Sequence, residues 1–388
     1  MRPFVLCWVS SCFCAYKASH VKRKSMMYFY SFLAIMIPAV MGGLRSLSRG
    51  VDIGTYAMPG YLRSMRASSF SELYPNGISM LPMLGVGLEL GWNLVTYYST
   101  KLFENIHWNL FMYQLITITC FYIGAWKHRK SAPLWLIMLM FFFIEYNHTY
   151  NIMRQSVACA IIFMEIDVLE ERKYLQFFLW IIVAAWFHTS AVICVIYMLL
   201  LHLVITSPTL WRHNKRKKNF LLYSAFGLLA FTRPLISLLF SLLPISAKYA
   251  HYTTVTREEV SGWFGVGWSQ VLLAIGEAVL FLLYANGAKK EFKANWIGGE
   301  GMFEYCRYIV FLMIIFRFGV GFFDRMILYL EWLNILILAS LPNFVKEKHL
   351  NAIVLVSVIG AAFLTLWHIH ILKGMVSGQT WPYRSILD

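Results

Sequence analysis

The sequence predicts an all-α polytopic membrane protein, with about 10–13 transmembrane helices in a single integral-membrane domain over residues 1–388. Hydrophobic residues make up 59% of the chain and charged residues 14%, whereas soluble proteins average roughly 45–50% and about 25%. Aromatic residues reach 17%, which suits the belts that anchor helices at the level of lipid headgroups. No Pro-, Gly- or Ser-rich linker divides the chain. Because this much apolar surface needs a hydrocarbon solvent, the composition excludes a soluble globular protein.

Apolar segments follow one another along the chain, and most approach the length of a spanning helix. They are residues 3–16, 26–44, 88–103, 108–126, 132–146, 151–169, 173–187, 189–205, 219–243, 266–286, 303–318, 324–342 and 350–368. Unpaired backbone amides are costly in hydrocarbon, so we expect helices. The first segment resembles the apolar part of a signal peptide. It lacks an A-x-A cleavage site, so we expect an uncleaved first helix.

The net charge of +15 is concentrated in short basic clusters between apolar segments. The clusters are Lys17–Lys24, Lys127–Lys130, Arg212–Lys218, Lys289–Lys293 and Lys346–Lys348. This placement is typical of cytoplasmic loops, where the clusters also meet anionic membrane lipid, and it argues against nucleic-acid binding. The same rule places residues 45–87 and 244–265 outside, as two long external loops.

The N-terminal third does not fit the charge rule in a simple way. If residues 45–87 are external, two further crossings give the wrong parity at Lys127. One candidate segment therefore does not cross. Residues 88–103 are the weaker of the two, because they contain Glu89 and Asn93.

The first group of candidate site residues lies in GGLRSLSRGVDIGTY at 42–56. Two arginines at a membrane face, Arg45 and Arg49, can bind a pyrophosphate through bidentate hydrogen bonds. Simple snorkelling toward lipid headgroups is an equal alternative. Asp52 follows three residues after Arg49 and can pair with an arginine, with Tyr56 beyond it.

The second candidate is Arg154 in NHTYNIMRQSVACA at 147–160, because it opens an apolar segment. An ionisable residue inside such a segment indicates function by default. The structural alternative is a tie to Asp52, Glu145 or a backbone carbonyl.

The third candidate is His188 in AAWFHTSAV at 184–192, where it interrupts an apolar stretch. An imidazole with a pKa near 6.5 can act as a general base toward a sugar hydroxyl. The alternative is a histidine that only satisfies a hydrogen bond.

The fourth group lies around the segment FRFGVGFFDRMILY at 316–329, where Arg317 and Arg325 flank a turn that we expect to be external. Tyr329 follows one helical turn after Arg325. Further polar aromatic residues are expected on the same side: Tyr249, His251 and Tyr252. Arginines from separate regions thus reach one membrane face, which indicates a cationic pocket for an anionic lipid-linked substrate.

Several classes of site are missing from the sequence. It has no Walker A motif, GxSxG elbow, HExxH motif or CxxC pair, and its seven cysteines lie mostly in apolar runs. We therefore expect no metal and no cofactor. A transferase that used a nucleotide sugar would usually need a soluble nucleotide-binding domain, so a donor already in the membrane fits better.

These motifs, taken in order, resemble the EpsG/Wzy family of polysaccharide polymerases. The matching residues are Gly43, Leu44, Arg45, Gly50, Asp52, Tyr56, Asn151, Arg154, Gln155, Ala158, Ala184, Phe187, His188, Ser190, Ala191, Lys248, Tyr249, Tyr252, Arg325 and Tyr329. One departure is Ile53, where the family commonly has threonine. The resemblance implies a GT-C-like bundle in the bacterial cytoplasmic membrane. It also implies a metal-independent glycosyltransferase that joins undecaprenyl-pyrophosphate-linked oligosaccharide repeat units into O-antigen, capsule or exopolysaccharide, in possible contact with a chain-length regulator.

For that reaction, the resemblance and the residue chemistry predict three roles for the candidate residues. The expected catalytic residues are His188, Asp52 and Arg154. The expected pyrophosphate-binding residues are Arg45, Arg49, Arg154, Arg317 and Arg325. The expected glycan contacts are Tyr56, Tyr249, His251, Tyr252 and Tyr329. Either His188 or Asp52 takes the acceptor proton. A flippase for the same lipid-linked sugars and an O-antigen-type ligase stay open as alternatives, while a membrane O-acyltransferase fits less well.

Overall fold

The structure is a computed structural model, and it describes most of the N-terminal half and parts of the C-terminal half of the chain. The described residues are 2–74, 89–192, 198–199, 202–203, 220, 224, 276, 305, 308–310, 321–345, 348–367, 371 and 380–386. Every regular element among them is a helix, and an isolated β-bridge joins Arg45 to Ser385. The all-α prediction is confirmed for this part of the chain.

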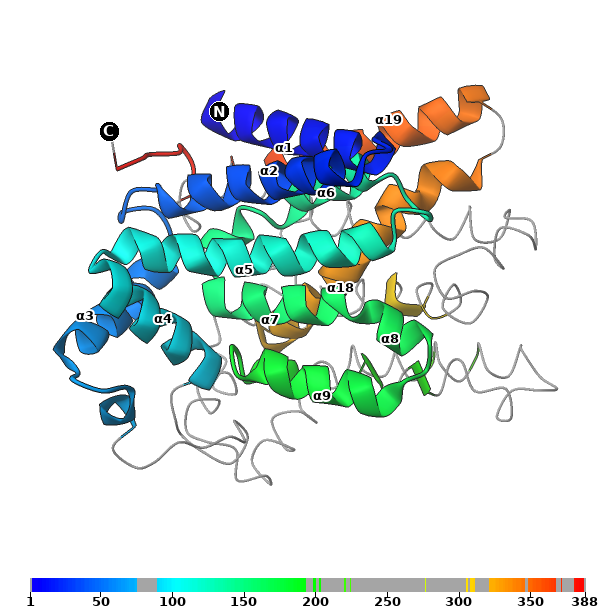
Figure 1. Ribbon diagram of the computed structural model, residues 1–388. Coiled ribbons are helices and arrows are strands. Elements are labelled where there is room, and N and C mark those ends of the chain that lie inside the picture. Colours follow the sequence, from blue (N-terminus) through cyan, green and yellow to red (C-terminus); the bar gives the residue numbers. More distant parts are fainter. Residues whose placement is uncertain are drawn as a thin grey trace, which may run out of the picture. The chain divides into compact units, whose positions relative to one another are not determined.

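The helices follow the predicted apolar segments closely (Figure 1). The α-helices are α1 (Arg2–His20), α2 (Lys24–Gly43), α3 (Met58–Arg66), α4 (Leu90–Phe103), α5 (Ile106–Lys127), α6 (Leu134–Ile144), α7 (Met153–Met164), α8 (Ile166–Glu170), α9 (Tyr174–Ala185), α18 (Gly321–Ser340) and α19 (Lys348–Thr365). Short helical turns are η1 (Ile53–Ala57), η2 (Phe70–Leu73), η3 (His148–Tyr150) and η4 (Leu341–Phe344). The predicted segments between 189 and 318 and the predicted external loop 244–265 lie largely or wholly outside the described residues.

The chain forms two compact units, residues 1–196 with 335–388 and residues 197–334. In the described part, α2 and α19 are long and apolar enough to cross a membrane, and α6, α7 and α9 are apolar but shorter. Length and composition are all that this finding rests on. The first unit contains most of the described motif residues, so its internal order matters most.

Side-chain contacts fix the direction of the helices in the first unit. The helices α2 and α5 are antiparallel, because His107 Nδ1 lies 2.9 Å from the Gly43 carbonyl and Tyr122 donates to Ser31 over 2.8 Å. The helices α5 and α7 are parallel. Near their starts Gln114 donates to Thr149 Oγ1 over 2.8 Å, and at their ends Lys127 Nζ donates to the Met164 carbonyl over 2.9 Å.

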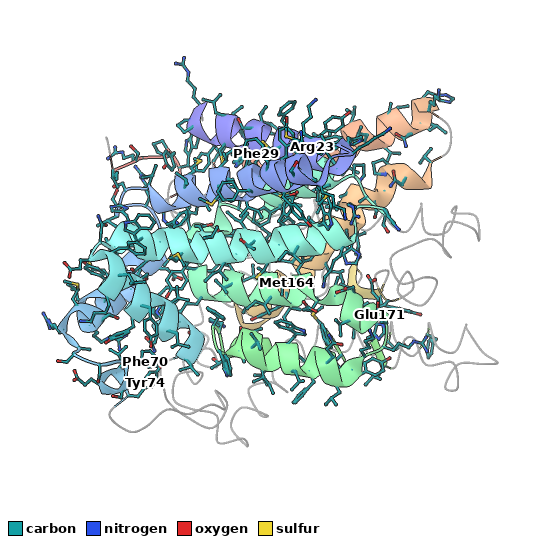
Figure 2. The ribbon with its side chains drawn as sticks, in the orientation of Figure 1. Arg23, Phe29, Phe70, Tyr74, Met164 and Glu171 are labelled. Carbon is teal, nitrogen blue, oxygen red and sulfur yellow. The ribbon has the colours of Figure 1, made fainter. Side chains whose placement is uncertain are left out.

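The first unit therefore has two different ends (Figure 1). We call the end formed by residues 43–52, 105–107, 145–154 and 186–190 the motif end. We call the end formed by residues 17–24, 127–130 and 165–173 the basic end. In Figure 2 the labelled Phe70 lies beside the motif end, near α3 and α4, and the labelled Glu171 lies at the basic end. The described basic clusters of the N-terminal half thus share one end.

The short helix α4 does not extend along the whole of α5. It has 14 residues and packs antiparallel to the first half of α5. Tyr113 donates to the Trp92 carbonyl over 2.6 Å, and Asn109 donates to Thr100 Oγ1 over 3.0 Å. Because α4 begins beside Tyr113, about two turns into α5, it does not reach the basic end. The weaker of the two candidate crossings is the one that stops short.

The predicted external loop 45–87 contains regular structure in its described part. It folds into η1, α3 and η2, and Asn93 of α4 donates to the Tyr74 hydroxyl over 3.0 Å (Figure 2). The rings of Phe70 and Tyr74 lie 5.4 Å apart. The Tyr and Phe content of this segment is used for packing against α4, and helix formation satisfies its backbone groups.

Candidate functional site

Two sequence motifs about 100 residues apart meet at the start of α7. The backbone N–H of Val51 donates to Asn151 Oδ1 over 3.0 Å, and Asp52 Oδ2 accepts from the Met153 N–H over 2.9 Å. Ile152, the N-cap residue of α7, makes no side-chain cap of its own. Asp52 therefore caps α7 from another segment, a contact that stabilises a helix by about 0.5–2 kcal/mol.

Gly50 allows this approach. It has a φ of +111°, which only glycine adopts without strain. A Cβ at this position would lie 2.5 Å from the Tyr150 carbonyl oxygen. The G-x-D spacing is thus explained by geometry, because the glycine brings the backbone against Tyr150 and Asp52 then reaches the α7 N-terminus.

Arg154 is held by one carboxylate and by aromatic rings. Its Nη1 lies 2.6 Å from Glu89 Oε2, with side-chain exposures of 13% for Arg154 and 3% for Glu89. Its guanidinium carbon lies 3.7 Å from the centre of the Tyr56 ring and 5.9 Å from that of Trp92. The predicted structural tie exists, but its partner is Glu89 rather than Asp52 or Glu145. Among the described residues, Arg154 Nε has no hydrogen-bond partner.

Glu89 is the site residue that the sequence did not identify. Its Oε2 binds Arg154 and its Oε1 accepts from the Thr189 N–H over 3.2 Å, so it bridges two motifs. The sequence signal was a carboxylate at the start of an apolar segment. That carboxylate was interpreted only as weakening a membrane span, whereas it marks the point where α4 begins.

His188 lies in the turn that follows α9. Its Nδ1 is 2.6 Å from Ser190 Oγ, and the Ser190 N–H donates to the same nitrogen over 3.3 Å. The turn packs on the start of α4, where the Gly91 N–H donates to the Trp186 carbonyl over 2.8 Å. Because a backbone N–H can only donate, Nδ1 is an acceptor and neutral His188 carries its proton on Nε2.

Arg45 and Arg49 have different surroundings. Arg45 is fully buried, and it donates to the Gly42 carbonyl over 3.0 Å and to Met153 Sδ over 2.9 Å. Its guanidinium carbon lies 4.4 Å from the centre of the Tyr150 ring. Burial lowers the pKa of Arg45. Arg49 is half-buried and donates to the Trp381 carbonyl over 3.3 Å.

The structure brings together only part of the predicted site. Tyr56 is 37% exposed beside Arg154, whereas Tyr329 is buried within the second unit. Arg317, Tyr249, His251 and Tyr252 lie outside the described residues, and for Arg325 the backbone alone is described, as part of α18. Near η3, His148 Nδ1 and Glu145 Oε2 lie 3.4 Å apart, but two such groups do not define a metal site.

The comparison with known proteins agrees with the family resemblance. The family description EpsG matches residues 28–385, which is nearly the whole chain. No curated protein and no solved structure matches the chain. The match begins within α2 and ends at Ser385, a residue of the Arg45–Ser385 bridge, so it includes every residue of the site described above. The chain belongs to the EpsG family.

Proposed function

We propose that this protein is a multi-pass membrane glycosyltransferase that polymerises oligosaccharide repeat units carried on undecaprenyl pyrophosphate. The observation that carries the proposal is the convergence of three separate motifs on Arg154 at one end of the first unit. Glu89 and Thr189 contact each other, Glu89 binds Arg154, and Asp52 caps the helix that carries Arg154. A guanidinium fixed beside the exposed side chain of Tyr56 suits an anionic glycosyl donor.

The same geometry supports an orientation of the first unit in the membrane. The basic end carries the described lysine clusters of the N-terminal half, which the positive-inside rule assigns to the cytoplasm. The motif end then faces the outer side of the bacterial cytoplasmic membrane. A donor and an acceptor that are both anchored by polyprenyl chains would reach the site from the membrane at that level.

In the proposed reaction, the bond between the anomeric carbon and the diphosphate oxygen of the donor breaks, and an acceptor hydroxyl oxygen attacks the anomeric carbon. The leaving group is the diphosphate of the lipid carrier, on which negative charge grows in the transition state. Arg154 stabilises that charge, with Glu89 and the Tyr56 ring holding its guanidinium in place. Arg317 and Arg325 remain proposed phosphate contacts.

Of the two candidates for the acceptor proton, the geometry favours Asp52 over His188. The His188 tautomer presents an N–H at Nε2, which suits a hydrogen bond to a phosphate or sugar oxygen. Asp52 uses Oδ2 in the cap of α7, and a carboxylate has further lone pairs to accept a proton. We no longer propose Arg45 as a pyrophosphate contact, because its guanidinium is fully buried and packs against Met153 of α7.

The remaining aromatic residues are proposed to contact the glycan. Tyr56 has the clearest role, because Arg154 covers one face of a ring that is 37% exposed. A sugar can pack its apolar face against such a ring. Tyr249, His251, Tyr252 and Tyr329 complete the proposed set of glycan contacts, and a chain-length regulator is a proposed partner.

Reconstitution with lipid-linked repeat units tests the function. The wild-type protein should convert them into a ladder of oligomers. A product with a single transferred unit on another acceptor would identify a ligase, and translocation without new bonds would identify a flippase. Either result overturns the proposal.

The Asp52→Asn variant tests the assignment of the base. Asparagine caps a helix as well as aspartate does, so the variant should fold normally but lose most of its turnover. His188→Gln should retain more activity than Asp52→Asn, because glutamine can still donate a hydrogen bond. Full activity of Asp52→Asn at normal protein level would exclude Asp52 as the proton acceptor.

A further inference from the structure

The C-terminal residues 380–386, which we call the C-terminal strap, are fixed against the motif end. The Ser46 N–H donates to the Arg384 carbonyl over 2.8 Å, and the Ile386 N–H donates to the Leu44 carbonyl over 2.9 Å. The Tyr383 hydroxyl donates to the Met41 carbonyl over 2.9 Å. These contacts hold the backbone on both sides of Arg384, so its position is set by the fold and not by its own side chain.

Arg49 contacts the strap, which carries Arg384 with its side chain exposed. The Arg49 guanidinium donates to the Trp381 carbonyl of the strap, and its Nε is buried without a hydrogen-bond partner in the described part of the chain. Partial burial lowers the pKa of Arg49, and the positive charge of Arg384 lowers it further. Neither arginine forms an ion pair with a described carboxylate, and the Asp52 carboxylate nearby in sequence is engaged with the Met153 N–H.

The positive charges of Arg49 and Arg384 repel each other, no carboxylate in the described part of the chain pairs with either, and the partial burial of Arg49 reduces the screening by water. Backbone contacts fix the strap against residues 44–46, so the two charges stay on adjoining segments in spite of this repulsion. A bound dianion reverses the sign of the interaction, and guanidinium groups match phosphate oxygens with paired hydrogen bonds.

We propose that Arg49 and Arg384 together bind a phosphate group, and that this group belongs to the diphosphate of the lipid-linked oligosaccharide, an assignment that rests on the proposed function. Arg154 differs from this pair because Glu89 already balances its charge at 2.6 Å. The two sites thus have different proposed roles. The Arg49–Arg384 pair binds the substrate in its ground state, and Arg154 acts on the transition state.

Binding of inorganic pyrophosphate to the full-length protein in detergent, measured by calorimetry, tests the site without turnover. Arg49→Ala and Arg384→Ala should each weaken binding about 10-fold or more, since each removes charge-assisted hydrogen bonds. Arg384→Lys should lie between these variants and the wild type. The matched control is Arg129→Ala at the basic end, because Arg129 also donates to a tryptophan carbonyl, that of Trp126, over 2.7 Å. This control should bind like the wild type.

Kinetics with lipid-linked units add a second readout. Arg384→Ala should raise the KM with little change in kcat, whereas Arg154→Ala should lower kcat. Unchanged pyrophosphate binding in folded Arg49→Ala and Arg384→Ala variants would overturn the proposal. The proposal would also be overturned if the two variants bind pyrophosphate like the wild type but are no longer stabilised by phosphatidylglycerol in nanodiscs. That result would mean that the arginines bind a lipid headgroup. If the wild type makes no oligomer ladder but binds pyrophosphate through these arginines, the proposed polymerase function fails and the phosphate site stands.

Discussion

At the basic end of the first unit Lys127 lies 2.9 Å from Asp167 with 30% of its side chain exposed, whereas at the motif end Arg45 is fully buried against Tyr150. Cations at the basic end thus pair with carboxylates near the surface, a contact worth about 0–1 kcal/mol. At the motif end, Arg45 and Arg49 are held by carbonyl oxygens, sulfur and a ring, and Arg154 is held by the buried carboxylate of Glu89 and by rings. Removing a cation from water costs free energy. A buried arginine therefore needs an explanation other than the charge rule for membrane topology.

This difference teaches that the number of basic residues at an end is a poor guide to function. The charge rule assigns clusters such as Lys127–Lys130 to one side of a membrane, and surface lysines are sufficient for that. The arginines of the motif end are fewer but fixed in position. The first experiments should therefore test whether the fixed arginines carry activity and the surface lysines do not.

The largest effect is expected for Arg154→Ala, which should lower the turnover of lipid-linked units by about 10²–10³-fold, because a charge-stabilising donor is lost from the transition state. The single variant also leaves Glu89 buried without its partner, which destabilises proteins by about 3–5 kcal/mol. The length of polymer and the protein level in cells should both be measured.

The double variant Arg154→Ala with Glu89→Gln separates the two causes. It removes the buried unpaired carboxylate, so protein level and thermal stability should recover relative to Arg154→Ala alone. Turnover should stay low if Arg154 acts in the reaction. Recovery of full polymer length in the double variant would show that Arg154 serves only as a structural tie.

The next effect is structural. Gly50→Ala should lower the free energy of unfolding by about 2–3 kcal/mol, because it combines a positive φ with a Cβ placed 2.5 Å from the Tyr150 carbonyl oxygen. Thermal unfolding of the purified protein in detergent measures this. Gly54→Ala is the matched control, since a Cβ there would meet nothing within 4 Å. Equal melting temperatures for the two variants would mean that the Gly50 turn is not as tight as described.

The sequence predicted the helices better than the site. The apolar pattern predicted a helix over residues 26–44, and α2 spans Lys24–Gly43. Such a pattern is local information, so it can be read from the sequence alone. The role of Glu89 was not predictable in this way. Its partner Arg154 lies 65 residues later, and only the packing of α4 and α7 against α5 brings the two together. A carboxylate in an apolar segment is ambiguous until the path of the chain is known.

The same limit applies to the arginines. Arg45 and Arg49 are four residues apart and were given one role, but the end of α2 turns Arg45 inward and leaves Arg49 half-buried beside the strap. Asp52 was considered as a partner for an arginine; its carboxylate caps the N-terminus of α7, and its charge also opposes the lowering of the pKa of Arg45 by burial. Spacing predicted the candidate residues. It could not assign their partners, because those depend on tertiary contacts.

A smaller, pH-dependent effect is expected at the basic end. Burial raises the pKa of Glu170 to about 9 and lowers the pKa of His128 to about 4, and the His128 Nδ1 and Glu170 Oε1 atoms lie 3.8 Å apart. Asp167, Glu171 and Lys127 are the charged neighbours of Glu170. An unfolded Glu170 ionises near 4.5, so its stabilising contribution is full below that pH and is lost as the pH rises toward 9.

Glu170→Gln removes this titration. Between pH 7 and 9, where His128 is neutral in both states, the wild type should lose about 1–2 kcal/mol of stability that the variant keeps. Melting temperatures at pH 7 and 9 measure the difference. His128 acts in the opposite direction, since its contribution is lost as the pH falls from 6.5 toward 4. Parallel pH profiles for the two proteins would show that Glu170 is already ionised in the folded state.

The smallest effect is expected for Lys127→Gln. Lys127 Nζ lies 2.9 Å from Asp167 and 3.5 Å from Glu165, but water and salt screen a side chain that is 30% exposed. The loss of stability should stay below about 1 kcal/mol and shrink further at high salt. Turnover should not change, because Lys127 lies at the end opposite to Arg154. A loss of activity at unchanged stability would mean that a surface lysine of the basic end affects the reaction, and the contrast between the two ends would no longer hold.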